Sequence, residues 1–210
     1  MIRIHKRQPP TSLTQYRREC LDSLNRGVIH LLDDFLMKGS LRRQLAEEQG
    51  YLCAYCLQRI SADPLDTKIE HVIAQTLQPL KQLDYDNLLL CCKGNEGQSE
   101  NHHHCDTKKK DMEIKYNPAS YPNIEDTIRY KRNGTIISDD QEWDQQLNDV
   151  LNLNETRLRE NRKAAENALI EELGRKLGTR TKGKIDHMIV GLTENQEYRR
   201  EVETLLWNTP

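Results

Sequence analysis

The sequence predicts an α+β fold that is predominantly helical, with a small central core flanked by N- and C-terminal helices and a short β-hairpin. Apolar residues recur at helical spacing near both ends of the chain, over residues 11–50 and 141–178. Residues 51–116 lose that spacing and concentrate Cys, His, Asn and Lys. Asn133-Gly134 lies between two short β-prone runs, which is typical of a hairpin turn.

Composition narrows the class of protein. The 210 residues are ample for an independent core in one or two domains. The formal net charge is −2, whereas a protein that binds duplex nucleic acid by charge alone is usually basic. We therefore expect the chain to bind nucleic acid weakly and to depend on a partner for binding. No apolar run is long enough to span a membrane, and residues 1–7 lack the apolar stretch of a signal peptide. We therefore expect a cytoplasmic protein without a membrane span.

The N-terminal region, 1–50, predicts two helices separated at Gly39. The first begins near residue 11, where Thr and Ser are suitable caps, and carries apolar residues at roughly helical spacing. The second covers 41–49 and is expected to stop at Gly50, in the position that glycine favours after a helix.

The central region, 51–116, predicts two strands and a helix. The strands are expected at 67–73 and 87–92. A polar loop of turn-forming residues follows over 94–101, and a helix over 106–112 would place Asp106 at its positively polarised N-terminus.

The C-terminal region, 117–210, predicts a hairpin and then helices that could dock a partner. The hairpin is expected within 126–138. Asn154 is the expected N-cap of the longest helix. The helices are expected at 141–151, 154–178 and 193–207.

Four of the six cysteines are spaced as ligands of a closed metal site. Cys53 and Cys56 form a C-x-x-C pair, and Cys92 and Cys105 follow in the same region. Without an export signal, such cysteines favour metal over disulfides, and four thiolates around tetrahedral zinc make a structural site. Cys91 competes with Cys92, because adjacent strand residues point to opposite faces. The three histidines just before Cys105 could also supply a ligand.

The same region carries groups suited to phosphodiester cleavage, which needs a deprotonated water and neutralisation of charge on the phosphate. His71 is the candidate general base, since a neutral imidazole accepts a proton near physiological pH. Glu70 and Asp106 are the candidate ligands of a catalytic Mg²⁺ or Mn²⁺. Asn87 could hydrogen-bond the imidazole, directly or through its backbone carbonyl, and Lys109 with its neighbours could hold phosphate oxygens.

At these positions the chain resembles the HNH endonucleases, ββα-metal nucleases that carry a structural zinc. The five-residue spacing after Asn87 matches that family's third cysteine and favours Cys92 over Cys91. The narrower resemblance is to the retron-associated and Septu-type, PtuB-like members, and it covers most of the chain. It is carried by Cys53-Ala54-Tyr55-Cys56, Ile69-Glu70-His71, Asp84-Tyr85-Asp86-Asn87-Leu88-Leu89, His104-Cys105-Asp106-x-Lys108-Lys109 and Leu151-Asn152-Leu153-Asn154.

The resemblance implies a zinc-stapled ββα-metal core over 51–116 and a divalent-metal-dependent endonuclease that cuts DNA. It implies the effector subunit of an anti-phage complex, beside an SMC/ABC-type, PtuA-like ATPase, with retron RNA or DNA associated through that complex. Activity would be held back until the partner signals infection. Many members have Asn or His where this chain has Asp106, so the second ligand of the catalytic metal is either Asp106 or His104.

Two other functions fit the same residues. The chemistry could act on RNA, tRNA included, because it addresses a backbone phosphate and no base-reading surface is identifiable. A catalytically silent zinc module could instead tether a partner or nucleic acid. Such a module has no use for Glu70, His71 and Asp106 together.

Overall fold

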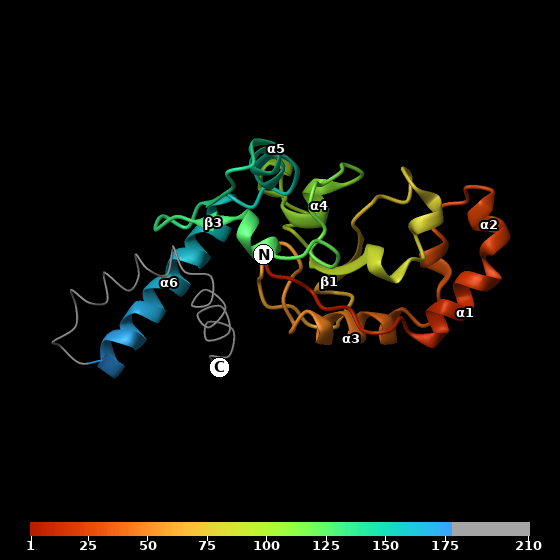
Figure 1. Cartoon of the computed structure of the whole chain (residues 1–210), viewed down its shortest axis with the longest axis horizontal. Coiled ribbons are helices and arrows are strands. Elements are labelled where there is room, and N and C mark those ends of the chain that lie inside the picture. The colour runs from red at the N-terminus through yellow and green to blue at the C-terminus, as the bar shows by residue number, and fades with distance from the viewer. Residues whose placement is uncertain (178–210) are drawn as a thin grey trace.

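The computed structural model describes residues 1–177, and its elements confirm the predicted α+β class (Figure 1). The helices are α1 (Thr11–Glu19), α2 (Leu21–Asn25), α3 (Lys38–Glu48), α4 (Cys105–Lys109), α5 (Gln141–Gln145) and α6 (Thr156–Leu177). The strands are β1 (Thr67–His71), β2 (Leu88–Cys92), β3 (Arg129–Tyr130) and β4 (Ile136–Ile137). Short 3-10 turns and one π-helical turn, Gln146–Val150, complete the described elements. In Figure 1, α6 extends away from the rest of the described chain.

The strands β1 and β2 form an antiparallel pair at the centre of the molecule. Thr67 lies opposite Cys92, and His71 lies opposite Leu88. β2 is buried along its whole length, and both α3 and α4 contact it. The pairing confirms the two predicted strands, each slightly shorter than expected. The end of β1 therefore meets the start of β2, and that edge carries the candidate site.

The N-terminal helices differ from the prediction. The expected first helix is broken after α1 at Cys20, which has φ −87° and ψ 5°, and again after α2, where Gly27 and His30 adopt left-handed backbone angles with φ of +75° and +66°. The left-handed angles of Gly27 and His30 cannot continue an α-helix. Gly39 does not separate two helices but lies inside α3, where no neighbouring atom would meet an added Cβ. The predicted stop at Gly50 is confirmed, since that residue has a φ of +61° directly after α3 and Gln49.

The helix predicted at 106–112 is also shorter than expected. α4 begins at Cys105 and ends at Lys109, because Lys110 turns the chain with φ +52° and ψ −125°. This turn directs the residues after α4 away from the helix axis. It also fixes where the side chain of Lys109 points.

The hairpin around Asn133-Gly134 is confirmed as β3 and β4. The cap of α6 is Glu155 and not Asn154: a Glu155 carboxylate oxygen accepts from the backbone N–H groups of Arg157 and Leu158. Asn154 instead bonds the backbone of β4. The helix predicted over 193–207 lies outside the described residues, as does the connection before it.

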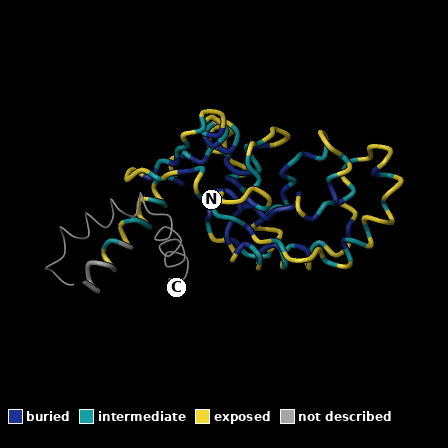
Figure 2. The backbone as a smooth tube through the Cα atoms, in the orientation of Figure 1, coloured by how far each residue is buried: buried dark blue, intermediate teal, exposed yellow. Residues whose placement is uncertain are grey.

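One cluster of buried hydrophobic residues extends from Met1 to Leu158 and draws on all three predicted regions (Figure 2). Trp143 and Tyr55 are its largest fully buried side chains. The regional boundaries near residues 50 and 116 stay predictions. Among residues 1–177, no helix is both long and apolar enough to cross a membrane.

Candidate functional site

The four cysteines chosen from the sequence come together in the structure. Cys53 and Cys56 lie in the loop before β1, Cys92 ends β2, and Cys105 begins α4. Their sulfur atoms all lie within 4.8 Å of one another and are buried or nearly so. The cluster thus ties the C-x-x-C loop, the sheet and α4 to one point. These residues could hold a metal ion such as zinc.

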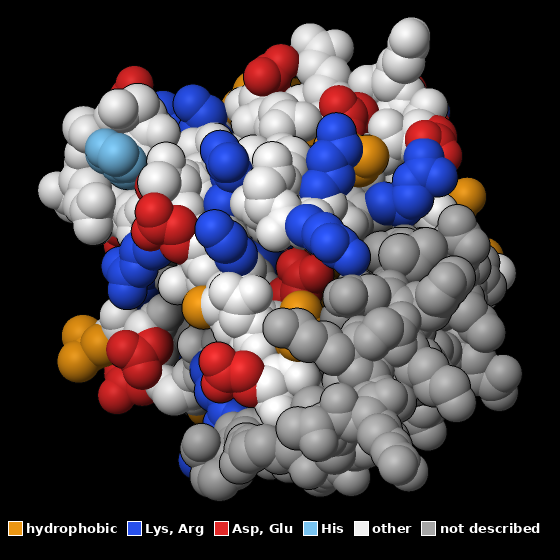
Figure 3. Space-filling view, turned by 90° about the vertical axis from the view of Figure 1, so that its left-hand side faces the viewer, with side chains coloured by type: hydrophobic (Ala, Val, Ile, Leu, Met, Phe, Trp, Pro, Cys, Tyr) orange, Lys and Arg blue, Asp and Glu red, His pale blue; other side chains and the backbone are white. Residues whose placement is uncertain are grey.

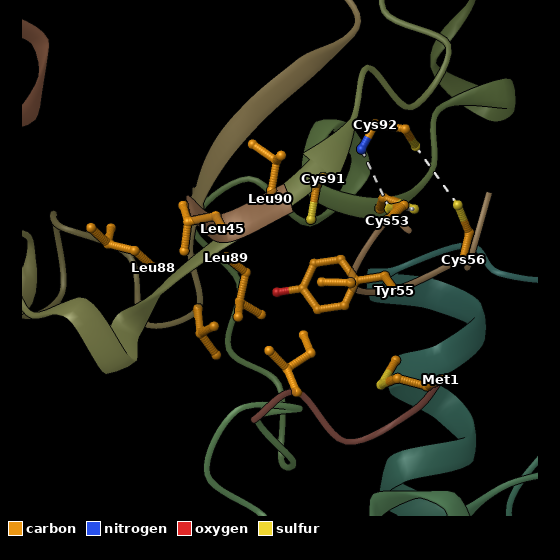
Figure 4. Close-up of a cluster of buried hydrophobic side chains, with 14 of the residues drawn as sticks. Met1, Leu45, Cys53, Tyr55, Cys56, Leu88, Leu89, Leu90, Cys91 and Cys92 are labelled. Carbon is orange, nitrogen blue, oxygen red and sulfur yellow. Dashed lines mark hydrogen bonds between the residues drawn. The ribbon is translucent and has the colours of Figure 1, made fainter. Parts of the chain in front are cut away.

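The sulfur geometry fits a tetrahedral metal. The sulfurs of Cys53 and Cys105 are 3.8 Å apart, and those of Cys56 and Cys92 are 3.7 Å apart (Figure 4). Sulfurs about 2.3 Å from a tetrahedral zinc would be separated by ~3.8 Å. All four thiols are free rather than joined in disulfides. These two distances therefore match the edges of a four-cysteine zinc site, and the other sulfur–sulfur distances stay within 4.8 Å.

Cys91 is not one of the four clustered ligands, as the alternation along β2 predicts, although its thiol interacts with that of Cys53. Burial raises the pKa of the Cys91 thiol well above its ordinary value, so this cysteine is a neutral core residue. Burial alone would also raise the pKa of the Cys53 thiol. Hydrogen bonding from Cys105 and the neighbouring cysteines outweighs that effect and lowers it well below its ordinary value. Position, and not pKa, separates Cys91 from the ligands, because burial also raises the pKa of the Cys56 and Cys105 thiols well above the ordinary value.

The three histidines before Cys105 have different partners. His102 lies 3.3 Å from a carboxylate oxygen of Glu155, and His103 bonds the carbonyl of Gln98. His104 is buried, with its Nδ1 3.2 Å from the sulfur of Cys105. His104 therefore faces the cysteine cluster.

Glu70 is a buried carboxylate with two donors on one oxygen. Its Oε1 accepts from the hydroxyl of Tyr55 and pairs with Nζ of Lys109, each at 2.9 Å. Burial raises the pKa of Glu70 well above its ordinary value, the charge of Asp106 adds to this, and Lys109 opposes it. Asp106 therefore lies beside Glu70. His104, the alternative second ligand, lies against the sulfur of Cys105 instead.

His71 is held by a backbone carbonyl. Its Nε2 lies 2.9 Å from the carbonyl oxygen of Gln82, which can only accept, so Nε2 carries the proton and Nδ1 is the free lone pair. Burial lowers the pKa of the His71 imidazole below its ordinary value, against the opposing influence of the Gln82 carbonyl and Asp106. The imidazole is therefore neutral at physiological pH and has a fixed tautomer.

Asn87 does not make the contact expected of it. Its side-chain oxygen accepts from the N–H of Ile73, and its amide donates to the carbonyls of Ile73 and Lys81. Its backbone carbonyl accepts from Val72. Asn87 thus holds the loop that follows β1. The carbonyl that hydrogen-bonds the His71 imidazole is that of Gln82. The expected Asn87–His71 hydrogen bond is wrong because all of these groups have local backbone partners.

Lys109 also differs from the expectation. Its side chain is fully buried, and Nζ donates to Glu70, to the carbonyl of His71 at 3.0 Å and to that of Lys110 at 3.4 Å. In this arrangement the ammonium cannot reach a phosphate in solvent. Lys68 is the more accessible ammonium, 3.8 Å from an Asp106 carboxylate oxygen and partly exposed.

Three groups of the site were not identified from the sequence. Gln82 acts through its backbone, for which no side-chain pattern exists. Lys68 lies on the strand two residues before Glu70, so period-two alternation could have placed it on the same face. Tyr55 lies inside the C-x-x-C pair, and its ring extends from that loop toward Leu89 (Figure 4).

Comparisons with known proteins add no family. A scan of the sequence against protein-family models gives no match, and a search of curated proteins gives none either. The resemblance to the HNH endonucleases therefore depends on the motifs of this chain alone.

Proposed function

We propose that this protein is a divalent-metal-dependent endonuclease of the HNH type that hydrolyses phosphodiester bonds in DNA. The observation that carries the proposal is His71: a buried neutral imidazole with a fixed tautomer, at the end of a strand and next to two carboxylates. A cysteine cluster anchors α4, which brings Asp106 to the same place. These are the parts of a metal-assisted hydrolase.

The residues divide the chemistry between them. Nδ1 of His71 accepts the proton of the attacking water, while the Gln82 carbonyl prevents the ring from turning. Asp106 and Glu70 would hold Mg²⁺ or Mn²⁺, which prefer oxygen ligands. Their donor set fits such an ion, because a divalent cation would offset both the burial and the neighbouring Asp106 charge that raise the pKa of Glu70. When bound, that ion supplies neutralisation of charge on the scissile phosphate.

A partner fits the charge of the surface. Figure 3 shows Lys and Arg side chains gathered across the α6 side of the molecule, with Asp and Glu side chains among them. Together with the net charge of −2, this mixture provides little of the electrostatic attraction that supports nucleic-acid binding. We propose that an SMC/ABC-type, PtuA-like ATPase supplies the additional nucleic-acid affinity and the activating signal. The two proteins would form a complex that defends against phage and carries retron nucleic acid.

Metal removal and restoration test the proposal. Cleavage of plasmid DNA would be measured after EDTA treatment and after addition of Mn²⁺, Mg²⁺ or Zn²⁺, with and without the ATPase. We expect EDTA to stop cleavage and Mn²⁺ or Mg²⁺ to restore it. Cleavage that persists in EDTA, or returns with Zn²⁺ alone, would contradict a hard-metal site. Total tRNA in parallel reactions distinguishes DNA from RNA, since the active site addresses a backbone phosphate in either.

The tethering module is the second candidate, favoured by one observation. The cysteine cluster by itself accounts for the metal-binding part of the site and needs no catalysis. If neither nucleic acid is cut under any of these conditions, and the chain binds the ATPase, the tethering role replaces the endonuclease.

A further inference from the structure

Lys109 is the most deeply buried charged group among the described residues, and its ammonium contacts Glu70, a proposed metal ligand. Its side chain has no exposed surface, and Glu70 is only 2% exposed. The three acceptors around Nζ are all oxygens: one carboxylate and the carbonyls of His71 and Lys110. Oxygen acceptors of this kind also suit a hard cation. Glu70 is therefore already neutralised by a cation that belongs to the chain.

The turn that positions Lys109 is a strained one. Lys110 has φ +52° and ψ −125°, a backbone conformation that side-chain-bearing residues rarely adopt. Strain of this kind is stored where the surrounding contacts hold it, and it is found at switching sites. The Lys109 ammonium donates to the carbonyl of Lys110 in this turn, alongside the backbone bonds from Lys110 to Asp106 and from Met112 to Lys109. Release of the ammonium would remove one of the contacts that hold the turn.

We propose that Lys109 is an internal counter-cation that closes the carboxylate site, and that a divalent cation must displace it from Glu70. The inference depends on the proposed function for the identity of the site. Asp106 is the entry point, because its side chain is partly exposed whereas that of Glu70 is not. The ammonium and the divalent cation compete, since like charges at short range repel strongly in a buried site. The resting protein thus binds Mg²⁺ or Mn²⁺ weakly.

Mn²⁺ affinity, read by electron paramagnetic resonance of the free ion, tests the competition without any substrate. Lys109→Met removes the ammonium and keeps most of the side-chain volume, so we expect Mn²⁺ to bind at least about tenfold tighter, ~1.4 kcal/mol. The control is Lys131→Met, which removes the same charge from an exposed side chain of the β3–β4 hairpin. Its affinity should equal that of the wild type. Adding Asp106→Asn to Lys109→Met should abolish the gain.

A second measurement uses the wild-type chain, in case Lys109→Met does not fold. An amine-reactive reagent followed by mass spectrometry reports which lysines are accessible. We expect Lys109 to be unreactive without metal and to become reactive in saturating Mn²⁺. Lys110 should react in both states, and the buried Lys6 in neither.

The outcomes separate this inference from the proposed function. Folded Lys109→Met that binds Mn²⁺ no tighter than the wild type, or a Lys109 that stays unreactive in Mn²⁺, overturns the displacement. Cleavage by the wild type would survive either result. Loss of the endonuclease, in contrast, would be seen only in the cleavage assays.

Discussion

Cys53→Ser provides the sharpest test of the cysteine cluster. Cys53 is fully buried, its sulfur is 3.8 Å from that of Cys105, and it also accepts the backbone N–H of Cys92. A serine oxygen is a poorer ligand for zinc, so the variant should lose the metal. Three segments that lie far apart in the sequence would then lose their common anchor.

The magnitude follows from what zinc contributes. Structural zinc supplies about 10–16 kcal/mol in small sites, whereas a whole domain is typically stable by about 5–15 kcal/mol. Loss of even about 5 kcal/mol should lower the melting temperature by ~10–20 °C for a chain of this size. Zinc content by mass spectrometry and thermal unfolding by circular dichroism measure both effects.

Cys91→Ser is the matched control, because Cys91 is the neighbouring residue on β2 and is just as buried but outside the cluster. Burying an unsatisfied hydroxyl there costs about 1–3 kcal/mol, which is a smaller fall in melting temperature, and zinc should be retained. A folded Cys53→Ser that keeps its zinc, or a Cys91→Ser that loses it, would refute the assignment of ligands.

Three further predictions concern stability. Glu70→Gln leaves the Lys109 ammonium buried without a counter-charge and should cost about 3 kcal/mol in urea unfolding; an unchanged midpoint would show that the pair is unimportant. Burial lowers the pKa of Lys6 to about 8, so between about pH 8 and about pH 10 the unfolded chain holds the proton more tightly. The stability of the wild type relative to Lys6→Met should therefore rise by up to about 3 kcal/mol over that range, and a flat difference would contradict it. Glu155→Ala should destabilise α6 by about 1 kcal/mol through loss of its N-cap. Its urea unfolding midpoint would be compared with that of Glu160→Ala, at an exposed position of the same helix, and equal midpoints would contradict the cap.

Much of the core could be predicted from the sequence, because the signals there are local. Alternation on β2 separates Cys92 from Cys91, and Asn133-Gly134 specifies a tight turn. The C-x-x-C pair and the two later cysteines have few other uses in such a chain. These features depend on spacing along the chain, and the structure contains all of them.

The rest depends on tertiary contacts that spacing does not encode. The break at Gly27 could not be predicted, because the apolar residues on both sides of it keep a helical period. The sequence therefore predicts one continuous helix there. The carbonyl of Gln82 reaches His71 only because Asn87 clamps the loop between them. Lys109 looks like part of a solvated lysine run, yet it is the one that turns inward, because Glu70 offers it a buried counter-charge.

The central claim is that His71 is the base of a phosphodiester hydrolase. The most direct test is cleavage of plasmid DNA and total tRNA in Mn²⁺, with the ATPase present, by the wild type, by His71→Ala and by His103→Ala, each checked for zinc content and melting temperature. We expect the wild type and His103→Ala to cut equally and His71→Ala to be inactive while still folded and zinc-bound. Equal cutting by His71→Ala would contradict the account.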